Sequence, residues 1–265
     1  MPTGARMSAS IRIAALALST LLAGPALAQE ETAWGELRSQ IVGAREVGDA
    51  AGLIELVTPK RAEDAAIVPL EVKLHLAPGD TRKVTALTLV VDENPAPVVG
   101  TFRFPEGRQA FDLQTRVRVN SYSWVRAIAE TDDGRLHMTK AYVKAAGGCS
   151  APAAKDPAEA LANLGQMRFR VFADRGEAQV QLRHPNYSGL QMDQVTRLYT
   201  PAWYVEKLSV RQGDKPLFSM VGGISISEDP TFRFSFAKTG EPVTVEAVDT
   251  QGRSFRQTFP AGEGS

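Results

Sequence analysis

Residues 123–145 read SWVRAIAETDDGRLHMTKAYVKA, a pattern that predicts a β-hairpin. Ser123–Thr131 and Leu136–Ala145 are strand-like, and Asp132-Asp133-Gly134 lies between them. Glycine takes positive φ without steric cost, so Gly134 suits the turn. A similar stretch, Val245–Arg253, recurs near the chain end. The likeness indicates either two related halves or a general property of hairpins that turn on glycine.

Further strand-like stretches lie on both sides of this hairpin. The stretches before it are Val68–Ala77, Ala86–Val91, Gly100–Phe104 and Ala110–Asn120. The stretches after it are Met167–Ala173, Gln179–His184, Tyr204–Gln212, Pro216–Met220, Thr231–Ala237, Val243–Asp249 and Ser254–Phe259. Short strands at this spacing, separated by polar turns, are typical of β-sandwiches. We therefore predict an all-β fold.

Two stretches depart from the strand pattern. Apolar residues fall on one helical face of Thr32–Ala44, which predicts a short N-terminal helix. Ser150–Leu164 is a low-complexity run followed by a short helical stretch with proline at its first position. The sequence thus predicts two β-sandwich domains, residues 29–149 and 165–265, joined by a flexible and helical linker, 150–164.

The first 28 residues are typical of a secretory signal peptide. Arg6 and Arg12 give a positive start, Ile13–Ala23 is apolar, and Ala26-Leu27-Ala28 is a small-residue cleavage site. The apolar run is shorter than the roughly 20 residues that span a bilayer. We expect cleavage after Ala28 and, in a Gram-negative source, a periplasmic protein.

Charge and histidine usage argue against two broad classes of function. The chain has 30 basic and 30 acidic residues, whereas nucleic-acid binding favours a concentrated basic surface. The three histidines, at 75, 137 and 184, form no metal-binding motif. We expect no nucleic-acid or membrane partner, no metal and no cofactor.

Cys149 is the one cysteine of the chain and the first candidate site residue. Gly147 and Gly148 precede it and Ser150 follows, which predicts an exposed thiol on a flexible arm. A single cysteine in an oxidising compartment indicates a reactive thiol or pairing with another molecule. A mobile thiol is badly held for catalysis in place, which needs fixed geometry. It suits a carrier that presents a bound group to other proteins.

A long loop that begins at His184 is the second candidate site. It runs to about Pro201, and loops carry function more often than strands. His184, Pro185, Tyr187 and Gly189 are its candidate docking residues.

Two ordered sets of motifs resemble known proteins. The first set is Val68-Pro69-Leu70, Asp92-Glu93-Asn94-Pro95, Thr115-Arg116-Val117-Arg118 and the run from Val143 to Cys149. The second set is His184–Gly189, Tyr204-Val205-Glu206, Gly222–Pro230 and the final hairpin. The first domain resembles the cysteine-bearing subunit of the SoxYZ sulfur carrier, and the second resembles its companion subunit. The fused arrangement resembles the SoxYZ-like carriers associated with quinoprotein dehydrogenases.

This resemblance implies an immunoglobulin-like sandwich on each side and no catalytic activity. Cys149 matches the carrier cysteine, which holds sulfur intermediates covalently while partner enzymes act on them. In the two-subunit carriers the cysteine arm is a free C-terminus, whereas here Ser150 follows and the chain continues. The arm is then tethered at both ends. The dehydrogenase association leaves open whether the cargo comes from thiosulfate oxidation.

Two other functions fit the same residues. The chain could be a docking module for a quinoprotein dehydrogenase or a cytochrome, with Cys149 incidental or redox-regulatory. It could also be a redox sensor that forms a dimer through Cys149.

Overall fold

The computed structural model describes residues 1, 31–50, 52–152, 157–193 and 196–261. The predicted signal peptide lies outside the described residues, apart from Met1. The elements of the first half are α1 Thr32–Val42, β1 Val47–Asp49, β2 Ile54–Val57, β3 Val68–His75, β4 Val84–Val91, β5 Val98–Arg108, β6 Ala110–Val117, β7 Ser123–Thr131 and β8 Leu136–Val143. Those of the second half are α2 Pro157–Ala162, β9 Met167–Phe172, the 3-10 turn Ala173–Arg175, β10 Glu177–Leu182, β11 Val205–Gln212, β12 Lys215–Gly222, β13 Thr231–Ser235, β14 Val243–Asp249 and β15 Ser254–Phe259.

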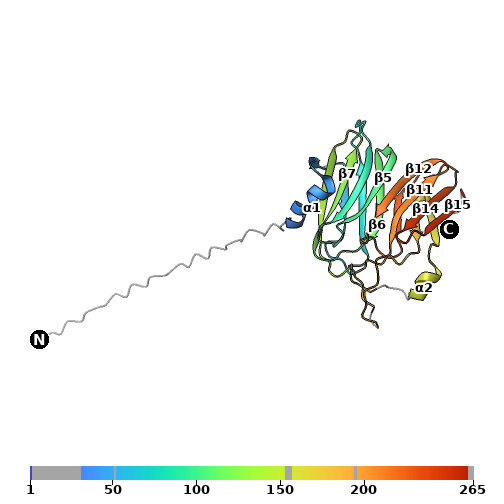
Figure 1. The fold of residues 1–265 in the computed structure, drawn as a ribbon. Coiled ribbons are helices and arrows are strands. Elements are labelled where there is room, and N and C mark those ends of the chain that lie inside the picture. Colours follow the sequence, from blue (N-terminus) through green and yellow to red (C-terminus); the bar gives the residue numbers. More distant parts are fainter. Residues whose placement is uncertain (2–30, 51, 153–156, 194–195, 262–265) are drawn as a thin grey trace. The chain divides into compact units, whose positions relative to one another are not determined.

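Among the described residues the strands form two facing sheets, and each sheet contains strands from both halves (Figure 1). One sheet has nine strands in the order β1-β8-β7-β4-β5-β12-β11-β14-β15. The other has six in the order β2-β3-β6-β13-β10-β9. The halves therefore meet edge to edge in both sheets, through β5–β12 and β6–β13. We call these two strand pairings the seam.

The seam has backbone pairing and a shared core. β5 and β12 run antiparallel, with Phe102 opposite Met220, and β6 and β13 place Leu113 opposite Phe234. Between the sheets, the Phe102 ring lies 6.1 Å from that of Phe218, across the two halves. One apolar cluster of buried residues contains members of both halves. The expected pairing of the two halves is confirmed, and it is built as one continuous core.

The two hairpins with similar sequences occupy equivalent places. Counted outward from the seam, β7 and β14 are each the third strand of the larger sheet, and β8 and β15 are each the fourth. Gly134 and Gly252 have φ of +79° and +78° and make the same turn, each donating its amide to the residue three positions earlier. The similarity therefore reflects two halves built alike.

Helix α1 covers the outer face of the nine-stranded sheet near β7 and β8. Trp34 packs with Ile128 and Leu136 in a small apolar cluster. Beneath the helix, the fully buried Arg126 bonds both carboxylate oxygens of Asp92 at 2.7–2.9 Å. The Arg126 guanidinium also lies 4.3 Å from the Trp34 ring centre. The ion pair thus lies within the sheet, and its arginine packs against the helix through the Trp34 ring.

The predicted all-β fold, with two immunoglobulin-like sandwich halves and a short N-terminal helix, is confirmed. Two short strands, β1 and β2, were not predicted, because their three and four residues are too few to show a period. Of the predicted linker, the structure describes 150–152 and 157–164, with α2 as its helical part.

Candidate functional site

The chain turns sharply after β8 over residues 147–150, which we call the Cys149 segment. The amides of Gly147 and Gly148 donate hydrogen bonds of 2.8 and 3.0 Å to the carbonyls of Asn120 and Val119. Those carbonyls belong to the stretch that leaves β6. The Cys149 segment is therefore fastened to the first half by backbone hydrogen bonds.

The two glycines of the segment are required for different reasons. Gly147 has φ +81°, which few other residues adopt. A Cβ on Gly148 would lie 2.0 Å from the carbonyl oxygen of Ala65 and 2.7 Å from that of Val119, so no side chain fits there. The expectation of a flexible arm at Gly147, Gly148 and Ser150 is wrong in this structure: the positive φ of Gly147 and the close backbone approach at Gly148, not freedom of the chain, require the glycines.

The Cys149 side chain is fully buried, so the expectation of an exposed thiol is also wrong. Burial raises the pKa of the Cys149 thiol from its ordinary 9.0 to about 11, although the charge of Arg118 acts in the opposite direction. The thiolate is the nucleophilic form of cysteine. In this closed arrangement Cys149 is therefore a protonated, poorly reactive thiol.

The second half covers the segment with the loop that begins at His184. The Ser188 hydroxyl donates a hydrogen bond to the Cys149 carbonyl, and the Gln191 side-chain amide donates one of 3.0 Å to the Ala151 carbonyl. The structure thus brings together the two candidate sites that the sequence placed 35 residues apart (184 − 149 = 35). Ser188 and Gln191 were missed, because nothing in the sequence distinguishes them from other polar loop residues.

The candidate docking residues are less exposed than expected. His184 and Pro185 are buried, so a partner protein does not reach them in this arrangement. Tyr187 and Gly189 are half-buried. His184 and Pro185 are buried because this end of the loop lies inside the second half. There it supports the part of the loop that lies over Cys149.

His184 has a structural position beneath the loop. Its ring packs edge-on against Trp203 at 4.9 Å, and its Nδ1 accepts the Asn186 amide at 3.0 Å. Burial lowers the pKa of His184, although Asp249, whose carboxylate lies 3.5 Å from Nε2, acts to raise it. His184 is a neutral side chain that holds the loop, and it is not placed as a base for Cys149.

Arg118 lies under both parts of the site. It is 2% exposed, and its two terminal nitrogens each donate a 3.2 Å hydrogen bond, one to the Gly148 carbonyl and one to the Asn186 carbonyl. The first carbonyl belongs to the residue before Cys149 and the second to the covering loop. Sequence reasoning quoted Arg118 only as part of a family motif, because its burial depends on segments far away in the chain.

Asn94 joins the two halves next to Arg118. Its side-chain nitrogen donates to the Arg118 carbonyl at 2.7 Å and to the Ser225 hydroxyl at 2.9 Å. Its side-chain oxygen accepts the Asn120 amide at 2.8 Å. All polar atoms of this buried side chain are therefore used to position the backbone that holds Arg118.

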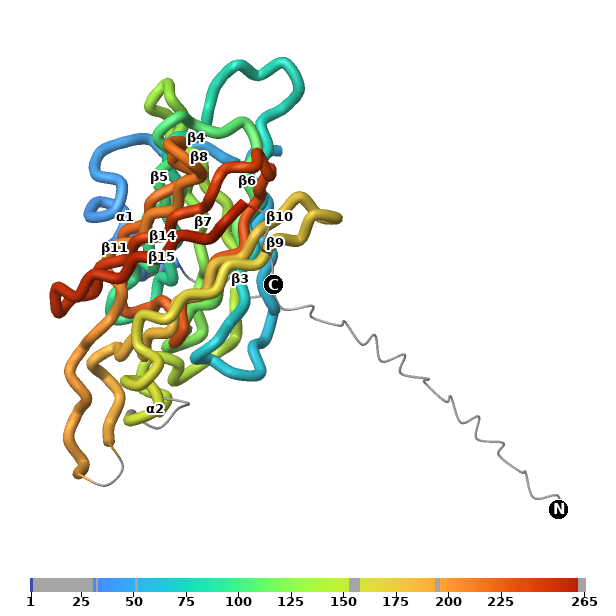
Figure 2. Tube along the Cα trace, turned by 90° about the vertical axis from the view of Figure 1, so that its right-hand side faces the viewer, coloured from blue at the N-terminus to red at the C-terminus, as the bar shows by residue number. Residues whose placement is uncertain are grey.

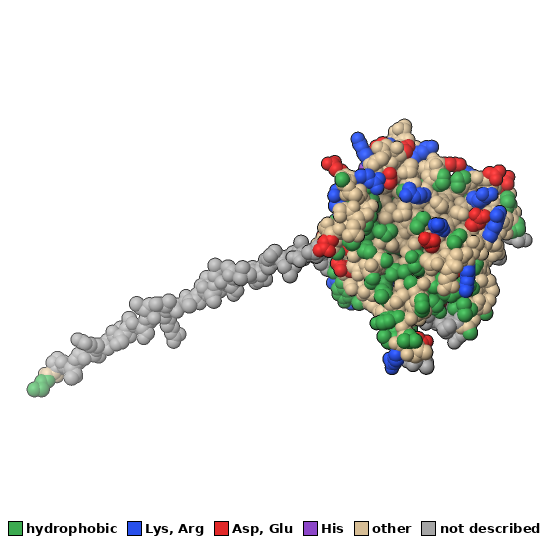
Figure 3. Space-filling view, in the orientation of Figure 1, with side chains coloured by type: hydrophobic (Ala, Val, Ile, Leu, Met, Phe, Trp, Pro, Cys, Tyr) green, Lys and Arg blue, Asp and Glu red, His purple; other side chains and the backbone are tan. Residues whose placement is uncertain are grey.

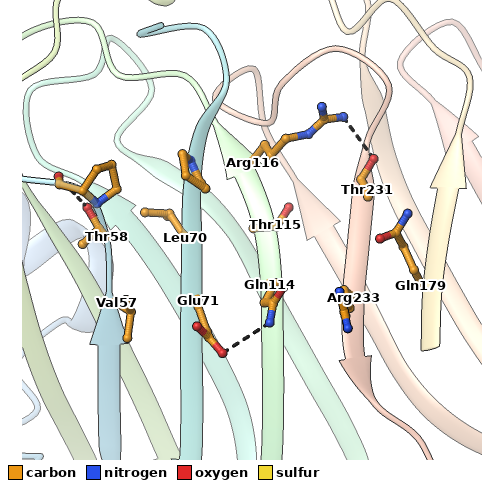
Figure 4. Close-up of a pocket in the computed structure, with 12 residues that line it drawn as sticks. Val57, Thr58, Leu70, Glu71, Gln114, Thr115, Arg116, Gln179, Thr231 and Arg233 are labelled. Atoms are coloured by element: carbon orange, nitrogen blue, oxygen red, sulfur yellow. Dashed lines mark hydrogen bonds between the residues drawn. The ribbon is translucent and has the colours of Figure 1, made fainter. Parts of the chain in front are cut away.

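A groove of about 540 Å³ crosses the seam on the six-stranded sheet (Figure 4). Arg116 points along it and donates to the Thr231 hydroxyl at 3.1 Å, while Gln114 donates to Glu71 at 3.3 Å. Arg233 is paired with Glu177. The residues that line the groove include no cysteine or histidine.

Beyond its first turn, the covering loop projects from the body of the protein as a two-stranded ribbon. Tyr187 pairs with Trp203, and Met192 pairs with Tyr199. Both views place this projection at the same end of the sheets as α2 (Figures 1 and 2). Leu198 and Tyr199 are 68% and 63% exposed, and hydrophobic side chains gather toward this end of the surface (Figure 3).

The described residues contain neither a metal-binding cluster nor a membrane-spanning helix. No group of three or more His, Cys, Asp or Glu side chains is placed to hold a metal ion within these residues. Nor does any helix in the described ranges have the length and apolar character to cross a membrane.

Comparison with known families gives two matches in one chain. The family model of sulfur oxidation protein SoxY matches residues 38–149, and that of sulphur oxidation protein SoxZ matches residues 170–260. No curated protein matches the chain.

Among solved structures, the chain is similar to the sulfur carrier protein SoxY from Chlorobium limicola f thiosulfatophilum. The two share 18% identity at a TM-score of 0.36, over 43% of this chain and 97% of that chain. A superoxide reductase (neelaredoxin) from Ignicoccus hospitalis shares 12% identity at a TM-score of 0.30, over 35% of this chain and 79% of that one. Both structural likenesses are weak, so the family assignment rests on the two sequence models.

Proposed function

Because the chain is a fused SoxYZ-like sulfur carrier, with a SoxY half followed by a SoxZ half, we propose that Cys149 carries sulfur intermediates covalently and presents them to partner enzymes. One observation carries this proposal: the sole cysteine is the last residue of the SoxY match and lies in a closed turn that both halves hold. A cysteine without a role would need neither the Gly147-Gly148 turn before it nor the loop of the second half that is hydrogen-bonded over it.

The closed arrangement implies that the segment opens in order to be loaded. Among the described residues, few hydrogen bonds hold it: those of the Gly147 and Gly148 amides and of the Ser188 and Arg118 side chains, with Gln191 holding the adjoining Ala151. Each such bond contributes a net stability of about 1 kcal/mol, since water replaces the partner when it breaks. Contact with a partner can therefore release the segment without unfolding either sheet.

The chain itself supplies no catalysis in this proposal. A thiol with a pKa of about 11 needs a base or a more polar environment before it reacts, and His184 is packed against Trp203 instead. Sulfur-oxidation enzymes, or a quinoprotein dehydrogenase or cytochrome, would supply the chemistry in the periplasm. The exposed Leu198 and Tyr199 of the projecting loop are the surface that we assign to docking.

A second candidate function is a docking module in which Cys149 is incidental or redox-regulatory. The observation that favours it is the complete burial of the thiol, which raises the pKa of Cys149. The two functions differ in what Cys149 holds: only the carrier bears a sulfur cargo on it that partner enzymes use.

The deciding experiment is the intact mass of the protein isolated from its native host. A carrier gives forms heavier by whole sulfur atoms or by oxidised sulfur groups, all of them absent in Cys149→Ala. Ser150→Ala is the matched control and should keep these forms. A mass without additions, together with full activity of Cys149→Ala in the host, would establish the docking module instead. A glutathione adduct or a disulfide dimer would indicate redox regulation.

The same measurement tests export. Cleavage after Ala28 would give a protein that begins at Gln29 and is recovered from the periplasmic fraction. A full-length mass in the cytoplasmic fraction would contradict the predicted location.

A further inference from the structure

The groove that crosses the seam on the six-stranded sheet is a feature that the carrier function does not use. Its lining comes from both halves of the chain: β2 and β3 supply Val57 and Pro69, and β13 and β10 supply Thr231 and Gln179. Since β6 and β13 pair at the seam, the groove is complete only when the two halves are joined. Its volume of about 540 Å³ lies within the roughly 300–1,000 Å³ of small-ligand sites, which occur preferentially at domain interfaces.

Arg116 is a cation of this groove that lacks a countercharge. Within the described residues it forms no ion pair: its Nη2 donates 3.1 Å hydrogen bonds to two neutral acceptors, the Asp229 carbonyl and the Thr231 hydroxyl. Its Nε is buried and has no partner. The other arginine in the lining, Arg233, instead bonds the Glu177 carboxylate through both Nε and Nη2. Arg116 therefore has the donors for a carboxylate but no carboxylate.

Two neutral side chains of the lining also have unused hydrogen-bonding groups. Thr115 is 6% exposed, and its hydroxyl oxygen is buried and has no partner in the described part of the chain. Gln179 makes no side-chain hydrogen bond there either, and it comes from β10, the strand next to the one that carries Thr231 (Figure 4). Buried polar groups without partners are uncommon in native proteins and call for an explanation. A polar ligand group in the groove supplies the missing partners.

The opposite side of the groove is apolar. Val57, at the end of β2, is 41% exposed, and Pro59 and Pro69 also belong to this side of the lining. In the sheet order β2-β3-β6, two strand spacings separate Val57 from the strand of Arg116, which amounts to roughly 10 Å. A ligand that pairs with Arg116 therefore extends a body of about this length over uncharged side chains.

Glu71 determines which end of the groove takes an anion. Its carboxylate accepts a 3.3 Å hydrogen bond from Gln114. The register of β3 and β6 places Glu71 opposite Gln114, and Pro69 opposite Arg116. A ligand carboxylate is repelled next to Glu71 and attracted next to Arg116.

We propose that this groove binds a small amphipathic carboxylate, whose anionic end pairs with Arg116 and whose aliphatic body lies over Val57, Pro59 and Pro69. The unpaired guanidinium identifies the charge of the ligand, and the exposed apolar side chains identify its body. The volume suits a free small molecule. The site goes beyond the carrier function and does not depend on it, since the residues that line the groove include none of the Cys149 segment.

The test compares octanoate with octanamide, which has the same chain but a neutral end. Each is titrated into the intact protein, and the chemical shifts of the backbone amides report where it binds and how tightly. We expect the shifts to be confined to the strands of the groove, namely β2, β3, β6, β13 and β10. Octanoate should bind roughly tenfold more tightly than octanamide, because a charge-assisted hydrogen bond is stronger than a neutral one.

Substitutions separate the charge from the apolar contact. Arg116→Gln should reduce the affinity for octanoate to that for octanamide, and it should leave the affinity for octanamide nearly unchanged. Val57→Ser should weaken both ligands and keep the ratio between them, because it removes apolar surface without altering the charge. Arg211→Gln and Val98→Ser are the matched controls, since both residues are exposed on the nine-stranded sheet. Both controls should bind the two ligands as wild type does.

Equal binding of the two ligands to wild type, or a preference for octanoate that survives in Arg116→Gln, would overturn the proposal. Absence of shifts at the groove at millimolar concentrations would also overturn it and would leave the groove to a protein partner. The wild-type comparison needs no variant, so it decides the matter even if Arg116→Gln folds poorly. Neither ligand modifies Cys149, and the carrier function is decided separately by the mass of native protein.

Discussion

At the scale of single residues, the Ser188 hydroxyl holds the cover on Cys149. Ser188→Ala removes its hydrogen bond to the Cys149 carbonyl, which contributes about 1 kcal/mol, and opening should become roughly fivefold more frequent. We expect the native thiol to react about fivefold faster with a thiol reagent, with little change in melting temperature. Ser150→Ala is the control, since within the described residues the Ser150 hydroxyl donates to the Gly147 carbonyl of the same segment. Equal rates in wild type and Ser188→Ala would show that the loop does not control access.

The pKa of Cys149 predicts a loss of stability at alkaline pH. Burial raises the pKa of Cys149 from 9.0 to about 11 in the folded state, so folding favours the protonated thiol. This contribution is complete below about pH 9 and is lost as the pH rises through about 11; its size is about 2–3 kcal/mol at most. Urea unfolding should show wild type losing more stability than Cys149→Ala between these pH values. Parallel pH profiles for the two proteins would contradict this prediction.

At the scale of elements, Gly148 decides whether the Cys149 segment closes. In Gly148→Ala the new Cβ would lie 2.0 Å from the Ala65 carbonyl oxygen, so the turn cannot dock. We expect a folded protein whose thiol reacts nearly as fast as in denaturant. In Gly134→Ala the Cβ meets nothing within 4 Å, although φ is +79°. That control should lose about 1 kcal/mol of stability and leave the thiol protected.

The sequence patterns predicted most of the strands correctly, but they did not predict that Cys149 is buried. Period-two burial survives in the structure, as in β3 and β10, because the two-layer fold buries one face of each strand. The glycines before Cys149 were misinterpreted because glycine signals equally a mobile chain and a close backbone approach. Only the positions of Ala65 and Val119, distant in sequence, decide between them.

The importance of Arg118 could not be predicted for a related reason. Arg116 and Arg118 are both arginines and are two residues apart, at the end of β6 and just after it. In the alternating pattern of a strand, both side chains are expected on the same face. Arg116 lies half-buried in the groove, whereas loops of both halves cover Arg118. The burial of Arg118 depends on its own segment, the Cys149 segment and the loop that begins at His184. The sequence around Arg118 therefore does not reveal it.

At the scale of the whole molecule, the seam predicts that the two halves stay together after the chain is cut. Both sheets and the apolar core continue across it, so a cut within residues 153–156 should leave a complex that elutes as one species at micromolar concentration. Phe218→Ala should weaken this complex, because removing a buried phenylalanine costs about 3–5 kcal/mol. Halves that separate on gel filtration without that substitution would show that the tether, rather than the seam, maintains the pairing.

Burial of Cys149 also has a consequence for oxidative damage. Peroxide and other oxidants convert accessible thiolates stepwise into sulfenic, sulfinic and sulfonic acids, and the last two steps are largely irreversible. The chain has no second cysteine to rescue an oxidised one by forming a disulfide. A turn that buries the sulfur and keeps it protonated shields the resting protein from this damage. The closure that buries the thiol thus protects the resting protein against irreversible oxidation.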